Sequence, residues 1–316
     1  MSFRRTIILG VVGDSATGKT TLSEGVARIL GPERVTVICT DDYHRYNREQ
    51  RLTLGINALE PAGNYIDIIE QHLELLHRGQ AILKPIYNHS TGNFDPPEYV
   101  EPREFIIVEG LLGYSTKAMR RDYDVKVYLA PEEELRIRWK FKRDTVKRGY
   151  GVEQVRDELE RRVPYSRDFI RPQQAHADIV VTFYRPPDHL EESGAHLNTR
   201  LILRPTLPHP DLSEVIRSGE GNHEQFLSST ISRQNDWLTE TLEISGRITP
   251  EKAAQLEEPI WRRLLSRLSD IQHLPADKLG AFMDGAVASQ SHPLALTQLL
   301  IAYHMLLVGE ELKREV

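Results

Sequence analysis

The stretch Gly13-Asp14-Ser15-Ala16-Thr17-Gly18-Lys19-Thr20 matches G-x-x-x-x-G-K-[ST], the pattern of a phosphate-binding P-loop. A short, β-branched apolar run over residues 6–12 precedes it and is typical of a buried parallel strand. After it, Leu22, Val26 and Ile29 recur at helical spacing until Gly31-Pro32. This order of strand, loop and helix directs backbone N–H groups and the positive end of a helix at a phosphate. The stretch therefore predicts a nucleotide phosphate site, and its flanking elements argue against a chance glycine-rich turn.

Individual residues of this loop have expected roles. Lys19 can reach the β- and γ-phosphates of ATP, and the Thr20 hydroxyl can join the shell of a Mg²⁺ ion. We therefore predict ATP as a ligand, bound by Gly13, Asp14, Ser15, Ala16, Thr17, Gly18, Lys19, Thr20 and Thr21.

Composition sets the class of protein. The 316 residues suggest one large domain or two smaller ones, with 40% apolar and 27% charged residues. A net charge of −6 gives no overall basic field, so we expect no nucleic-acid partner. The single cysteine excludes an intramolecular disulfide and fits a reducing compartment. We expect neither a signal peptide nor a membrane span, and hence a cytoplasmic location.

Acidic residues end two further predicted strands. Residues 35–40 lead into Asp41 and Asp42, and the apolar run 105–110 contains Glu109. The carboxyl ends of parallel strands form the ligand-binding edge of an α/β sheet. A carboxylate there can accept a hydroxyl proton or hold magnesium, and Glu109 fits the Walker B position. A solvated acidic loop and a surface glutamate are the alternatives.

Hydrogen-bonding side chains gather in two loops. Residues 84–97 are rich in turn formers, which predicts a hairpin or an extended loop. Tyr87 and His89 lie in it and suit a polar sugar. His44 and Arg48 are four residues apart and would face the same way in a helical turn.

A predicted helix over residues 131–148 carries a charged face. Lys140, Arg143, Asp144 and Lys147 lie at helical spacing on one side of it. Such faces usually make ion pairs in solvent. Alternatively, this one closes over phosphates as a lid and neutralises charge on a transferred phosphoryl group. The spacing leaves both interpretations open.

Taken together, these motifs resemble the phosphoribulokinases, a branch of the phosphoribulokinase/uridine kinase group of P-loop kinases. The resemblance covers residues 5–185 and extends more loosely over 198–210 and 243–264. Besides the P-loop it is carried by residues 40–44, 84–92, 95–98, 108–110, 143–144 and 148–150.

The resemblance implies that the γ-phosphoryl of ATP passes to the 1-hydroxyl of ribulose 5-phosphate, a sugar phosphate, as in the Calvin cycle. It implies that Asp41 is the catalytic base and that Lys19, Arg143 and Asp144 also act in catalysis. Glu109 and Thr20 would hold Mg²⁺. It further implies substrate contacts from His44, Arg48, Tyr87, His89, Lys140 and Arg148, and it matches Arg161-Arg162 to a basic pair linked to substrate or effector binding.

One departure from the family bears on regulation. Thiol-regulated members carry a cysteine in the P-loop that pairs with a second one before the Asp-Asp. Here Cys39 keeps the second position, while Thr17 occupies the first. Inactivation by that disulfide, and a light-regulated complex built on it, are therefore not expected.

The predicted fold is an α/β, P-loop NTPase-type, mostly parallel sheet flanked by helices, with a mainly helical C-terminal extension. We expect a kinase core over residues 1–190 and the extension over 191–316, joined by a linker near 185–194. The extension should hold a strand at 197–203 and helices over 251–268, 279–287 and 294–307. The last helix is nearly all apolar, so the core or another subunit must cover it, and we expect a homo-oligomer.

Two other functions remain open. A uridine kinase shares the fold and the P-loop, but the Tyr87-Asn88-His89 loop and the long extension fit a phosphoribulokinase better. A non-catalytic nucleotide-gated sensor or scaffold should lack the base or the magnesium acid. Asp41, Glu109 and Lys19 are all present, which argues against it.

Overall fold

The computed structural model describes residues 6–187, 194–219, 226–234, 237–268, 274–285 and 287–314. The chain forms two compact units, each assembled from segments that are distant in sequence. The first unit comprises Met1–Lys19, Arg34–Tyr128 and Ile137–Ala177, and the second comprises Thr20–Glu33, Leu129–Arg136 and Asp178–Val316. The predicted linker falls largely on residues 188–193, outside the described residues.

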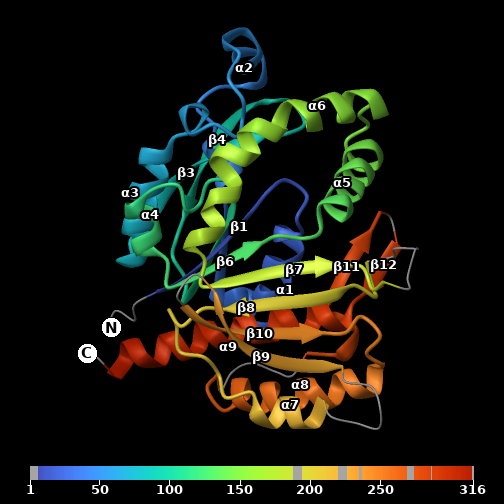
Figure 1. Ribbon diagram of the computed structural model, residues 1–316. Helices are drawn as coiled ribbons and strands as arrows, with labels where there is room; N and C mark the ends of the chain where they lie inside the picture. Colours follow the sequence, from blue (N-terminus) through green and yellow to red (C-terminus); the bar gives the residue numbers. More distant parts are fainter. Residues whose placement is uncertain are drawn as a thin grey trace. The chain divides into compact units, whose positions relative to one another are not determined.

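The first unit contains a sheet in the order β2-β5-β1-β6, of which Figure 1 labels β1 and β6. Both β1 and β2 run parallel to β5, with Leu9 opposite Ile107 and Cys39 opposite Glu109. All residues of β1 and β5 are buried, as their continuous apolar runs predict. The strands are β1 (Ile7–Gly13), β2 (Val35–Cys39), β5 (Phe105–Gly110) and β6 (Val125–Leu129).

Residues 84–97, predicted as a hairpin or an extended loop, form an antiparallel hairpin. Its strands are β3 (Ile82–Asn88) and β4 (Asn93–Val100). It pairs Tyr87 with Phe94, and Gly92 at its tip has φ 78°. Among the described strands the two pair only with each other, so the hairpin is its own two-stranded sheet.

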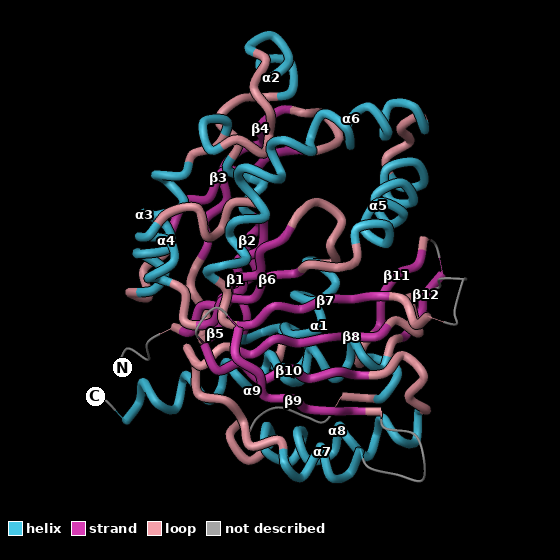
Figure 2. Tube along the Cα trace, viewed as in Figure 1, coloured by secondary structure: helices cyan, strands magenta, loops and turns pink. Residues whose placement is uncertain are grey.

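Helices surround these strands, as Figure 2 shows. Helix α2 begins with a capping box between Asn47 and Gln50 and ends at Gly55 in the left-handed conformation. Helix α3 buries Ile69, Leu73 and Leu76. The helices are α2 (Arg48–Leu54), α3 (Ile66–His77), α4 (Lys117–Asp122), α5 (Glu133–Lys142) and α6 (Val152–Tyr165), with a 3₁₀ turn at Thr40–Tyr43.

The predicted α-helix over residues 131–148 is wrong at its C-terminal end. After Lys142 the chain continues as a π-helix, Arg143–Lys147. The turn is wider there, yet the predicted neighbours still meet: Asp144 bonds to Lys140, four residues earlier, and to Arg143.

The second unit contains an antiparallel sheet in the order β7-β8-β10-β9. The strand predicted at 197–203 is confirmed as β8. The hairpin of β9 and β10 was not predicted, because Leu-Ser-Ser-Thr-Ile-Ser-Arg-Gln in β9 is a polar strand without apolar alternation. The strands are β7 (Ile179–Tyr184), β8 (Asn198–Leu203), β9 (Leu227–Gln234) and β10 (Trp237–Ile244).

Helices cover this sheet, and α8 packs against α7 and α9. The predicted helix over residues 279–287 is wrong. Gly280 and Gly285 adopt φ 63° and 68°, which breaks a helix, and the segment forms a hairpin instead. The remaining elements are α1 (Lys19–Leu30), α7 (Ser213–Gly219), α8 (Pro250–Leu265), β11 (Ala281–Asp284), β12 (Val287–Gln290) and α9 (His292–Arg314).

Helix α9 is by length and composition able to cross a membrane, over His292–Leu312. However, 89% of its most apolar window is buried within the protein. The apolar helix predicted at 294–307 is therefore covered by the core, as a central helix of a globular unit would be.

Candidate active site

The P-loop curls around its own lysine. Ala16 and Gly18 adopt φ 64° and 91°, and a Cβ at Gly18 would meet no atom within 4 Å. Lys19 Nζ donates to the carbonyl oxygens of Gly13 at 3.0 Å and of Asp14 at 2.8 Å. The loop thus has the left-handed residues that turn backbone N–H groups inward. Thr20 and Thr21 follow in the first turn of α1.

The two predicted acids lie near Lys19. Burial lowers the pKa of Lys19, while the negative charges of Asp41 and Glu109 act in the opposite direction. Glu109 is buried in β5, and Asp41 lies in the turn that directly follows β2. Because β2 and β5 pair in parallel, they deliver both carboxylates to one edge of the sheet.

Asp41 and its neighbour Asp42 have different surroundings. Asp42 accepts a hydrogen bond from Lys84 Nζ at 2.5 Å and another from the backbone N–H of Tyr87 at 3.1 Å. Within the described part of the chain, no side chain donates a hydrogen bond to the Asp41 carboxylate. Asp42 therefore anchors the β3–β4 hairpin, a contact that Asp41 does not share.

His44 is held as a neutral imidazole. Asn64 Nδ2 donates to the carbonyls of Ala58 at 3.0 Å and Glu60 at 2.7 Å, which fixes the orientation of the amide. Asn64 Oδ1 then accepts from His44 Nδ1 at 2.8 Å, so His44 Nε2 carries the free lone pair. Burial lowers the pKa of His44 to about 4, although Asp41 opposes the shift.

Rings from the turn and the hairpin lie together. The ring centroids of Tyr87 and His44 are 4.7 Å apart, and those of Tyr87 and His89 are 5.0 Å apart. Arg51 donates to the Tyr87 hydroxyl at 2.8 Å. Arg48 instead donates to the main-chain oxygen of His89, where it fastens the hairpin tip. Sequence reasoning missed Arg51, although it lies one helical turn after Arg48.

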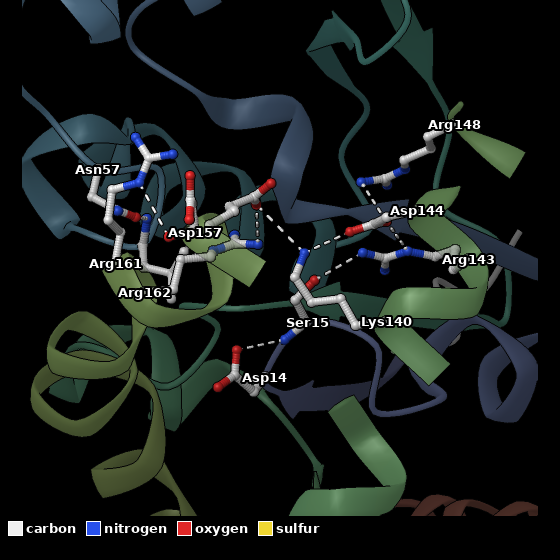
Figure 3. A network of polar contacts seen from close by, with 12 residues as sticks. Asp14, Ser15, Asn57, Lys140, Arg143, Asp144, Arg148, Asp157, Arg161 and Arg162 are labelled. Atoms are coloured by element: carbon white, nitrogen blue, oxygen red, sulfur yellow. Dashed lines mark hydrogen bonds and ion pairs between the residues drawn. The ribbon is translucent and has the colours of Figure 1, made fainter. Parts of the chain in front are cut away.

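The charged segment over residues 140–148 (hereafter the lid segment), which comprises the end of α5 and the π-helix that follows, is centred on a buried carboxylate (Figure 3). Asp144, 0% exposed, accepts hydrogen bonds from Lys140 at 2.6 Å and Arg143 at 2.8 Å, and it forms an ion pair with Arg148 at 3.4 Å. Burial alone would raise the pKa of Asp144, but these cations outweigh it and lower the pKa. The charged face predicted from the sequence is therefore not a set of ion pairs in solvent, because its central carboxylate is buried.

The lid segment also reaches the P-loop. Arg143 donates to Ser15 Oγ at 3.2 Å, as Figure 3 shows. Asp14 accepts from the backbone N–H of Ser15 at 2.6 Å and from the Ser166 hydroxyl. The P-loop thus makes polar contacts with two later segments of the first unit.

Helix α6 supports the lid segment through Glu158, which sequence reasoning missed, and through Arg162 of the predicted basic pair. Glu158 accepts from Lys140 at 3.4 Å and from Arg162 at 3.0 Å. Arg161, the other member of the predicted basic pair, donates to the main-chain oxygen of Asp157 at 3.2 Å. Arg162 therefore belongs to the ion-pair network of the lid segment.

The donor set is compatible with a magnesium–nucleotide complex. The described residues contain no group of three or more His, Cys, Asp or Glu side chains arranged for a metal. Mg²⁺ commonly uses only one or two protein carboxylates, together with substrate phosphates and water. Glu109 and Asp41 supply oxygen donors of this kind beside the P-loop lysine.

A P-loop at the end of a central parallel strand, with carboxylates on the neighbouring strand ends, defines a P-loop NTPase-type nucleotide-binding protein. The model of the Phosphoribulokinase / Uridine kinase family matches residues 8–188. The chain belongs to this family.

Several known relatives are similar to more than half of the chain. A phosphoribulokinase from Synechocystis sp. is 41% identical over 177 residues, which are 56% of this chain and 53% of that protein. The chloroplastic phosphoribulokinase of Arabidopsis thaliana is 33% identical over 222 residues, 64% and 55% of the two chains. A uridine kinase from Chloroflexus aurantiacus is 31% identical over 180 residues, 55% of this chain and 85% of that protein. The chain spans about half the length of the curated phosphoribulokinases it matches.

Among solved structures, phosphoribulokinase from Rhodobacter spheroides has a TM-score of 0.58 at 19% identity. The similarity covers 83% of this chain and 98% of that one. It supports the fold, including the C-terminal part that lies beyond the family match.

Proposed function

We propose that the protein transfers the γ-phosphoryl group of ATP to D-ribulose 5-phosphate and forms ribulose 1,5-bisphosphate. The observation that carries the proposal is the placement of Asp41. Asp41 directly follows β2, on the same sheet edge as Glu109, and its negative charge acts to raise the pKa of Lys19. The similarity to the Synechocystis phosphoribulokinase supports the choice of acceptor.

In the proposed reaction Asp41 accepts the proton of the sugar 1-hydroxyl. The oxygen of that hydroxyl attacks the γ-phosphorus of ATP at the same time. The new O–P bond forms as the bond to the bridging oxygen breaks, and ADP leaves. Lys19 and Arg143 would stabilise the charge that develops on the transferred group. The contact of Arg143 with Ser15 supports this role.

The sugar phosphate would lie between the turn that contains His44 and the β3–β4 hairpin. A neutral His44 suits a sugar hydroxyl, because the lone pair on His44 Nε2 can accept a hydrogen bond from the hydroxyl at neutral pH. The charges of Arg51 and Arg148 both act on His89, which supports a role for these guanidinium groups in holding the phosphate. Tyr87 and Arg48 would shape this subsite, and Lys140 would orient Asp144.

For the cofactor we propose ATP with Mg²⁺. When bound, the ion would bridge phosphate oxygens and neutralise their charge. Glu109 and the Thr20 hydroxyl are the proposed protein ligands. A homo-oligomeric state, a cytoplasmic location and a kinase core over residues 1–190 stay predictions.

The test is coupled ADP release with ribulose 5-phosphate, ribose 5-phosphate and uridine as acceptors. We expect turnover only with ribulose 5-phosphate, and a loss of about 10²–10⁴-fold in kcat for Asp41→Asn, with ATP affinity retained. Faster turnover of uridine would favour the uridine kinase alternative, since that relative is matched over 85% of its length. A normal rate in Asp41→Asn would remove the base from the mechanism.

A further inference from the structure

Gly25 occupies an unusual place in the middle of helix α1. Glycine weakens a helix interior relative to alanine. A Cβ at this position would lie 2.0 Å from Gln298 Nε2 and 2.1 Å from Gln298 Cδ. The absence of a side chain at Gly25 therefore lets the Gln298 amide approach the helix backbone.

Gln298 comes from the apolar helix α9 and is 0% exposed. Its Nε2 donates to the main-chain oxygen of Thr21 at 3.1 Å, and its Oε1 accepts from the backbone N–H of Gly280 at 3.2 Å. Both ends of a buried amide are thus satisfied, and one of them is bound to the first turn of α1. Thr21 follows Lys19 by two residues along the chain.

A second side chain links the same parts of the second unit. Arg28, near the end of α1, donates to the main-chain oxygens of Lys278 and Ala281, each at 3.4 Å. Helix α1 is therefore held near its beginning by Gln298 and near its end by Arg28. Gln298 and Arg28 also both bond to residues 278–281, a segment that ends at the first residue of β11.

We propose that Gln298 is a positioning residue for nucleotide binding. By fixing the Thr21 carbonyl, it sets the direction of the first turn of α1, whose N–H groups and Thr20 hydroxyl face the phosphates in the proposed ATP site. This inference rests on the proposed use of ATP and does not depend on which acceptor is phosphorylated. A small shift of these N–H groups weakens their hydrogen bonds to phosphate.

The test measures the Kd for ATP, the KM for the acceptor and the unfolding midpoint of the full chain. Gln298→Ala should raise the ATP Kd about fivefold, the value expected for one lost hydrogen bond, with the acceptor KM unchanged. Gly25→Ala should also raise the ATP Kd, because the new Cβ displaces the amide. When Gly25→Ala and Gln298→Ala are combined, the new Cβ at position 25 occupies space that the Gln298 side chain has left. The ATP Kd of this double variant should therefore be no higher than that of Gly25→Ala.

Thr297→Val is the matched control. Thr297 is adjacent to Gln298 and equally buried, but its hydroxyl donates only within α9, to the Pro293 carbonyl at 2.7 Å. This variant should lower the unfolding midpoint and leave the ATP Kd at the wild-type value. Should Gln298→Ala not fold, Gln298→Met fills similar space without a donor and allows the same comparison.

The inference is overturned when Gln298→Ala or Gln298→Met lowers only the unfolding midpoint, or when Thr297→Val raises the ATP Kd equally. Additive effects of Gly25→Ala and Gln298→Ala would also overturn it, because the two residues would then act separately. Turnover of a different acceptor would refute the proposed function alone and leave the effect on ATP affinity standing.

Discussion

Asp41 and Asp42 are adjacent in the sequence, but their carboxylates have different surroundings and different proposed roles. Asp42 binds Lys84, which is buried, and the backbone of Tyr87. Asp42→Asn leaves the buried ammonium with only the more distant carboxylate of Glu98, at 3.7 Å, and we expect the free energy of unfolding to fall by about 2 kcal/mol. The KM for the sugar phosphate should rise with little change for ATP. Urea unfolding and steady-state kinetics of Asp42→Asn beside Asp41→Asn test this; a loss of kcat alone in both variants would contradict the division.

The lid segment permits a second prediction about single residues. Asp144→Asn removes the charge that compensates Lys140, which is only 1% exposed. We expect a loss of about 3 kcal/mol in the free energy of unfolding and at least a tenfold loss in turnover. The control is Glu153→Gln, which breaks an ion pair with Arg156 whose side chains are 76% and 55% exposed. That variant should change stability by less than about 0.5 kcal/mol, and comparable losses in the two variants would refute our assignment.

At the scale of elements, the close approach of β5 to the turn after β2 brings Glu109 and Asp41 to one edge. A Cβ at Gly110 would lie 1.7 Å from Thr40 Oγ1, so this approach requires glycine. Gly110→Ala should push the strand and the turn apart and lower kcat/KM at least tenfold. Adding Thr40→Ala removes the nearest atom and should restore part of the activity. No recovery in the double variant would mean that the alanine acts in another way.

The elements also show what the sequence could and could not predict. The P-loop, β1, β5 and α3 have local signals, namely a motif, continuous apolar runs and a helical stripe. Contacts such as Arg51 with Tyr87, 36 residues apart, have no local signal and require the fold.

Local signals also failed where the backbone departs from regular geometry. Helical spacing predicted one face for Lys140, Arg143 and Asp144. These side chains do meet, but the spacing predicted neither the π-helix after Lys142 nor the burial of Asp144 at the centre of the cluster. In the second unit, Gly280 and Gly285 turn an apparently helical segment into a hairpin.

Across the molecule, stability should depend on pH through two buried groups of the second unit, His304 and Glu257. Burial lowers the pKa of His304 in α9 to about 4. Above the unfolded pKa of about 6.5 this histidine is neutral in both states, and below it only the unfolded chain takes up the proton. His304 should therefore cost about 2 kcal/mol of stability between pH 7 and pH 5. Glu257 in α8 acts in the opposite direction, since burial raises its pKa to about 7 and the folded state gains the proton first.

Because these two contributions oppose each other, the test compares variants and does not rely on the wild-type curve. Between pH 7 and pH 5, His304→Gln should lose less stability than the wild type, and Glu257→Gln should lose more, each by about 2 kcal/mol. Urea unfolding at several pH values measures this. Parallel curves for all three proteins would show that neither group titrates as its burial implies.

The β3–β4 hairpin pairs with no other described strand, and this independence has a consequence for protein engineering. Its attachment depends on a few side chains, chiefly Asp42 and Arg48, while Lys19 begins α1 and Glu109 lies in β5. We expect that a hairpin from a uridine kinase relative, introduced with Asp42 and Arg48 kept, changes the acceptor specificity of the proposed kinase. The residues that bind ATP would need no change.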